Sequence, residues 1–128
     1  MEVLAALPAL LGFAVHIGVV VALYAWGRRV AARLGGAWWQ RAAMLPLVAV
    51  ASEFLGVALT AVFLVRSFGA LGNVDPSRKA EMLARSISNA MNATAVFGGI
   101  AAMLYLASVV AFTAGTLRAR REDQARQA

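Results

Sequence analysis

The chain alternates long apolar stretches with short polar ones, and three of the apolar stretches are long enough to cross a membrane. They cover roughly residues 3–26, 43–65 and 90–117, and a spanning helix needs about 20 apolar residues. The third helix is expected to start earlier, because Asp75 and Pro76 form a typical N-cap and first helical position. The pattern therefore predicts an all-α, polytopic membrane protein with three transmembrane helices, the third long and extending beyond the bilayer.

The polar stretches are too short to build a separate soluble domain. Residues 27–42 contain tryptophans and the helix-breaking pair Gly35-Gly36. We expect a short helix lying on the membrane surface there. Residues 118–128 are expected to form a charged tail. At 128 residues and 62% hydrophobic composition, a soluble fold could not bury this much apolar surface. The prediction is one membrane domain, 1–128, ending in that tail.

Basic residues are distributed unevenly among the polar stretches. The first loop and the tail together hold eight arginines, the middle loop holds four basic residues, and the N-terminus holds none. Because Lys and Arg near span ends favour the cytoplasm, we expect a periplasmic N-terminus and a cytoplasmic C-terminus in a bacterial inner membrane. These arginines flank spans, so they favour contact with anionic membrane lipids and no binding of nucleic acid.

Few residues offer catalytic or metal chemistry. The chain has no cysteine, which excludes disulfides and thiolate sites, and we expect no enzymatic activity, no cofactor and no metal. His16 is the single histidine. It is expected to be a hydrogen-bonded packing residue; as a haem ligand it would need a second ligand from another chain.

Polar and small residues follow one face of the second and third spans. In the second span Glu53, Gly56 and Thr60 share a helical face. In the third, small side chains recur at every fourth position: Ala90, Thr94, Gly98 and Ala102. Such a stripe allows close helix packing, and threonines bonded to their own backbone would need no other role. Polar groups at this depth also indicate a pore or a subunit interface.

Glu53 and Asn89 are further candidates near these faces. An ionisable residue inside a span is a functional hypothesis by default. Glu53 either pairs structurally with Arg41 or Arg118, or contributes to an ion path.

The order of these motifs resembles a known family. Residues 55–62 read LGVALTAV and are followed by Phe68, similar to the penultimate span of the MotA/TolQ/ExbB proton-channel family, which reads LGLLGTV with a terminal AF. Downstream, the family's DP, LA, ISEAL and TA motifs are matched in order by Asp75-Pro76, Leu83-Ala84, Ile87-Ser88 with Ala90-Met91, and Thr94-Ala95. The resemblance covers roughly residues 50–102.

The resemblance implies a ring of five subunits whose last two spans line a pore. That pore would hold the single spans of two copies of a partner resembling ExbD, TolR or MotB. Thr60 and Thr94 would line the proton path to an aspartate on the partner, and proton-motive force would drive work in its periplasmic part. Asn89 stands where the family has a glutamate, and Glu53 would replace that acid at another depth. The family's large cytoplasmic insertion is absent, so this would be a short, divergent member.

Other classes of membrane protein also fit the pattern. A holin-like pore or membrane-stress protein shares the length, the three spans and the basic tail. A haem-bearing or quinone-site anchor subunit is suggested by His16 alone. A lipid-facing scaffold without transport is a further alternative.

Overall fold

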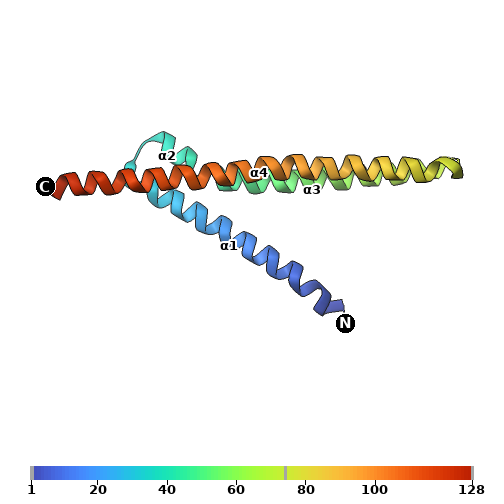
Figure 1. Cartoon of the computed structure of the whole chain (residues 1–128), viewed down its shortest axis with the longest axis horizontal. Helices are drawn as coiled ribbons and strands as arrows, with labels where there is room; N and C mark the ends of the chain where they lie inside the picture. The colour runs from blue at the N-terminus through green and yellow to red at the C-terminus, as the bar shows by residue number, and fades with distance from the viewer. Residues whose placement is uncertain (1, 74, 128) are drawn as a thin grey trace. The chain divides into compact units, whose positions relative to one another are not determined.

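The computed structural model describes residues 2–73 and 75–127, and all of its secondary structure in that part is helical. In chain order the elements are α1 (Glu2–Leu34), α2 (Ala37–Ala42), α3 (Leu45–Ala70), the 3₁₀ turn η1 (Leu71–Asn73) and α4 (Pro76–Gln127) (Figure 1). Three of the helices are long and apolar enough to cross a membrane. The predicted all-α membrane fold is therefore confirmed, including the long last helix of 52 residues.

The first helix continues two turns further than the apolar stretch that predicted it. Residues 27–34 are mostly arginine, alanine and leucine. These residues are good helix formers, so the helix continues although the sequence changes from apolar to basic. It ends where Gly35 and Gly36 adopt positive φ angles of 67° and 85°. The Gly35 amide donates to the Ala31 carbonyl at 2.9 Å, as in an αL cap. The surface helix predicted for residues 27–42 is thus limited to α2.

The start of α4 is fixed by Asp75, as the sequence predicts. Its Oδ1 atom accepts hydrogen bonds from the Ser77 amide at 3.1 Å and the Ser77 hydroxyl at 3.0 Å. Pro76 occupies the first helical position, where no amide donor is needed. The backbone bond from Ser77, followed by the hydroxyl bond, lowers the pKa of Asp75 below its ordinary value, because both stabilise the charged carboxylate.

The described helices group into two compact units, Ala49–Met103 and the combination of Met1–Val48 with Leu104–Ala128. In the unit Ala49–Met103, α3 and the first half of α4 form an antiparallel helical hairpin and lie side by side (Figure 1). In the other unit, α1 and α2 pack against the second half of α4. Each unit is held by its own set of contacts.

The unit formed by α1, α2 and the end of α4 has a small apolar core. Val30, Ala42 and Phe112 are buried at its centre. Two glycines let the helices approach closely: a Cβ on Gly27 would lie 2.5 Å from Phe112 Cζ, and one on Gly115 would lie 2.5 Å from Val30 Cγ1. Close approach at small residues is the usual way that helices pack in lipid.

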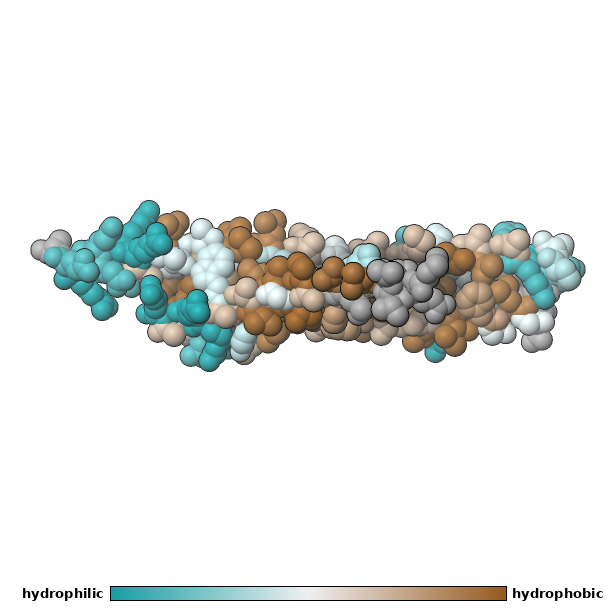
Figure 2. Space-filling view, turned by 90° about the horizontal axis from the view of Figure 1, so that it is seen from below, coloured by the Kyte–Doolittle hydropathy of each residue, from teal (hydrophilic) through white to brown (hydrophobic). Residues whose placement is uncertain are grey.

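Most of the large apolar side chains that the structure describes are exposed. Leu11, Phe54 and Met103 have exposed fractions of 58%, 59% and 74%, which is far more than the scattered apolar exposure of a soluble protein. Hydrophilic residues gather at both ends of α4, most densely at its C-terminal end, and hydrophobic residues lie between them (Figure 2). This distribution fits a protein whose apolar side chains face hydrocarbon.

Candidate polar site between two membrane helices

The central polar feature of the α3–α4 hairpin is a pair of threonine hydroxyls. Thr60 Oγ1 on α3 lies 2.6 Å from Thr94 Oγ1 on α4. The Thr60 hydroxyl also lies 2.9 Å from the Gly56 carbonyl of its own helix and 2.9 Å from the Ala90 carbonyl across the interface. Four residues singled out from the sequence, Gly56, Thr60, Ala90 and Thr94, therefore meet at one point.

Close packing on either side holds these hydroxyls together. Ala90 is almost fully buried. Gly56 is buried, and a Cβ added to it would lie only 2.7 Å from Phe97 Cβ. The Ser52 hydroxyl, one turn before Gly56, donates to the Phe97 carbonyl at 3.1 Å. The register of α3 against α4 is thus set by a small-residue contact with a polar bond next to it.

The two threonine hydroxyls differ in the hydrogen bonds that they can donate and accept. A hydroxyl has one proton to donate and two lone pairs to accept with. When Thr60 donates to a carbonyl, the short contact with Thr94 is made by the Thr94 proton. Thr94 is exposed and Thr60 is half-buried, so the acceptor capacity of the Thr94 oxygen is left for a group outside the hairpin.

Glu53 and Asn89 lie on the same two helices as this pair, Glu53 on α3 and Asn89 on α4. Glu53 is half-buried and precedes Thr60 by seven residues, which is about 10 Å along a helix. Arg118, one of its two expected ion-pair partners, is bonded through Nε to Glu122 Oε1 at 2.9 Å. Asn89 is exposed beside the buried Ala90. The ion-path roles of Glu53 and Asn89 stay predictions.

The far end of the small-residue stripe lies outside the hairpin contact. A Cβ added to Gly98 would meet nothing within 4 Å, and Ala102 is exposed. Steps of four residues turn a helix by about 40° each, so a stripe that faces α3 at Ala90 has rotated away by Ala102. The contact passes instead to Phe97 and Ala101, of which Ala101 is fully buried. A packing role for Gly98 and Ala102 in the α3–α4 contact is therefore not seen.

His16 makes the kind of hydrogen bond that the packing interpretation predicts. Its Nε2 atom lies 3.3 Å from the Tyr105 hydroxyl, and the two rings meet edge to face at 5.9 Å between centroids. They line an open groove of about 620 Å³ between α1 and α4. In the part of the chain that the structure describes, no three His, Asp or Glu side chains gather in a way that could hold a metal ion.

Two polar contributors were not singled out from the sequence. Ser52 was detectable, because Ser52, Gly56 and Thr60 form a stripe of small and polar residues at every fourth position of α3. Tyr105 carries no such signal: its contact depends on how α4 is rotated against α1, which a single sequence does not define.

Comparisons with protein-family models, curated proteins and solved structures find no match to this chain.

Proposed function

We propose that this chain is the proton-conducting subunit of an inner-membrane complex that uses proton-motive force to energise a partner reaching into the periplasm. The observation that carries the proposal is the Thr60–Thr94 hydroxyl pair, which joins two apolar helices at 2.6 Å. The motif order of residues 50–102, similar to the MotA/TolQ/ExbB family, supports it.

The pair has the chemistry that a proton or water wire requires. In one arrangement Thr94 donates to Thr60, and Thr60 donates to the Gly56 or Ala90 carbonyl. In the reverse arrangement Thr60 donates to Thr94, and Thr94 donates outwards. The two carbonyls lose little in the reversal, because each lies in a helix where a backbone amide four residues on can also bond to it. Two arrangements of similar energy let the pair change its polarity as a proton passes.

A complete path needs other chains in this proposal. Thr94 is exposed, and polar groups in hydrocarbon are favourable only when they face protein or water. The open surface at Gly98 and Ala102 suits close approach by a second copy. We propose a homopentamer around two copies of a single-span partner of the ExbD, TolR or MotB kind, with Glu53 supplying the acid that Asn89 lacks.

The proposed orientation follows from the arginines. The C-terminal ends of α1 and α4 carry most of the arginines of the chain, so both would lie in the cytoplasm. The turn at residues 71–75 and the N-terminus would then face the periplasm. In this arrangement the exposed first turns of α4 are placed where a periplasmic partner emerges from the pore.

Subunit composition is the first test of the proposal. The tagged chain would be purified gently from its host's membranes and weighed by native mass spectrometry. Five copies with two copies of a single-span protein would support the proposal and identify the partner. Monomers, a haem-bearing dimer, or large heterogeneous rings would overturn it in favour of a scaffold, a respiratory anchor or a holin-like pore, respectively.

Proton flux through the purified complex tests the site itself. In proteoliposomes carrying a pH-sensitive dye, Thr94→Val removes the hydroxyl while keeping the side-chain shape, and Thr94→Ser keeps the hydroxyl. We expect flux to be abolished in the first variant and retained in the second. Thr113→Val is a matched control, since Thr113 is an exposed threonine on the same helix. Flux unchanged in Thr94→Val would remove the hydroxyl pair from the proton path.

A further inference from the structure

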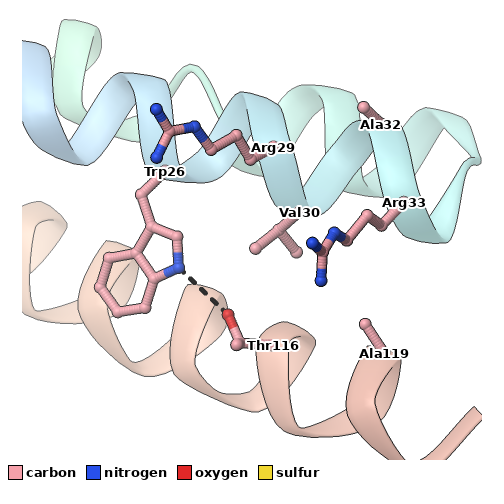
Figure 3. A pocket seen from close by; sticks show the side chains of 7 residues that line it. All are labelled: Trp26, Arg29, Val30, Ala32, Arg33, Thr116 and Ala119. Carbon is pink, nitrogen blue, oxygen red and sulfur yellow. Dashed lines mark hydrogen bonds between the residues drawn. The ribbon is translucent and has the colours of Figure 1, made fainter. Parts of the chain in front are cut away.

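A second polar feature lies where the apolar part of α1 ends against α4. A hollow of about 370 Å³ separates the two helices there (Figure 3). The indole of Trp26 closes one end, and its Nε1 donates to Thr116 Oγ1 at 3.1 Å. The Thr116 hydroxyl in turn donates to the Phe112 carbonyl at 2.7 Å. Two hydrogen bonds therefore hold this end of the hollow in place.

The lining of the hollow combines cationic side chains from α1 with apolar side chains from both helices (Figure 3). Arg29 and Arg33 lie one turn apart on α1 and are both exposed. In Figure 3 the Arg33 guanidinium is directed into the space between the helices. Val30 on α1 and Ala119 on α4, both buried, belong to the apolar part of the lining. No carboxylate is among the described residues that line this hollow.

Two carboxylates line the adjoining hollow, further along α4. That hollow, of about 310 Å³, shares Arg33 and Ala119 with the first and adds Glu122 and Asp123. Glu122 is paired with Arg118 at 2.9 Å, which offsets its charge locally. Along α4 the order is therefore apolar span, then the cationic hollow, then the acids.

This order places the cationic hollow at the level of lipid headgroups. On α4, Arg118 is the first charged residue after the apolar run that follows Arg85, and Thr116 and Ala119 flank it. On α1, Arg28 and Arg29 follow directly after the apolar stretch. Tryptophan and arginine at the end of a span are typical of the interface between hydrocarbon and water.

We propose that this hollow is a specific binding site for the phosphate of an anionic phospholipid. Guanidinium groups match phosphate oxygens with paired, charge-assisted hydrogen bonds. Arg33 directs one into the hollow, and Arg29, one turn earlier on the same helix, provides a second when its side chain turns from the direction drawn in Figure 3. The apolar part of the lining receives the glycerol and the upper acyl chains. The lipid joins α1 to α4 from outside, and the site is independent of the proton-channel function.

Single-lipid binding to the delipidated full chain tests this site. Palmitoyl-oleoyl-phosphatidylglycerol would be titrated in detergent and bound copies resolved by native mass spectrometry. We expect Arg29→Gln/Arg33→Gln to weaken the tightest binding event by about tenfold or more, as loss of charged hydrogen bonds implies. Arg120→Gln/Arg121→Gln removes the same charge from exposed positions outside the hollow, and should change binding by less than about twofold.

Two further arms of the titration distinguish the source of the phosphate. Inorganic phosphate at millimolar concentration should leave the bound phosphatidylglycerol in place; its displacement would identify a free-phosphate site and overturn the lipid assignment. Palmitoyl-oleoyl-phosphatidylcholine, with the same chains and a neutral headgroup, should bind more weakly. Equal losses in the two double variants would mean general charge attraction and would also overturn the proposal. Unchanged helical circular dichroism in both variants would confirm that folding is intact.

Discussion

Replacing Gly56 by alanine tests the close contact that aligns the two hydroxyls. The added Cβ would lie 2.7 Å from Phe97 Cβ, whereas ordinary contact begins at 3.4 Å. Phe97 Cβ is attached directly to the backbone, so rotation of the ring cannot relieve the clash, and the helices must separate by about 0.7 Å. The same displacement would lengthen the Thr60–Thr94 contact from 2.6 Å to about 3.3 Å, beyond the range of a strong hydroxyl bond.

Two opposing terms set the expected stability of the Gly56→Ala variant. Overpacking costs about 1–3 kcal/mol, and replacing glycine by alanine inside a helix returns about 0.5–1 kcal/mol. We therefore expect a net loss of about 0.5–2 kcal/mol in equilibrium unfolding in mixed micelles. Gly98→Ala is the matched control, because its Cβ would meet nothing within 4 Å, and it should be neutral or slightly stabilising. If both variants were equally stable, the contact at Gly56 would not be the constraint described above.

Three further predictions concern the helix termini and the α1–α4 contact. The folded pKa of Asp75 is lowered from its ordinary value of 3.8. Its stabilisation of the start of α4 is therefore fully present above that value and is lost as pH falls through the folded pKa. Amide exchange at Ser77 should show this loss, and Asp75→Asn should abolish the pH dependence. Trp26→Phe keeps an aromatic ring but deletes the bond to Thr116, and should cost about 0.5–1.5 kcal/mol of unfolding free energy; no loss would mean that the bond is not formed in the membrane. Tyr105→Phe removes the hydroxyl that meets His16, and should cost about 0.6 kcal/mol, the average for polar contacts between membrane helices; an unshifted imidazole NMR resonance would contradict the contact.

Local sequence signals predicted the helix starts and breaks well, because they depend on neighbouring residues. Asp75, Pro76 and the Gly35-Gly36 pair act through their own backbone geometry. The end of α1 was placed too early because hydropathy marks where hydrocarbon ends, whereas helix propensity decides where the helix ends. Arginine and alanine continue a helix into water, and residues 27–34 do so.

From the sequence alone, helix–helix contacts could be predicted only at residues whose type restricts where they can lie in a membrane protein. Thr60, Thr94 and Gly56 are small or polar within apolar spans, and a polar group there has few favourable places other than a helix interface. The rotation of each helix is a property of the packed pair. For that reason a stripe drawn at every fourth residue begins at Ala90, which is buried, but continues to Gly98, where an added Cβ would meet nothing within 4 Å, and to Ala102, which is exposed.

The unequal surroundings of the two threonines separate a packing role from a conducting one. Thr60→Val removes contacts to Gly56, Ala90 and Thr94 together, and we expect a loss of about 1–2 kcal/mol in unfolding free energy, near the upper range for polar contacts in lipid.

Thr94→Val leaves Thr60 able to donate its one proton to the Gly56 or the Ala90 carbonyl. It should cost only about 0.5 kcal/mol, yet it removes the hydroxyl that faces out of the hairpin. If packing is the whole role, loss of function should follow loss of stability, and Thr60→Val should be the more harmful change. If the pair conducts protons, Thr94→Val should abolish flux in a complex that remains nearly as stable as the parent. A Thr94→Val complex with full flux, beside a Thr60→Val complex that fails to assemble, would show that the hydroxyl pair holds the helices together and does nothing more.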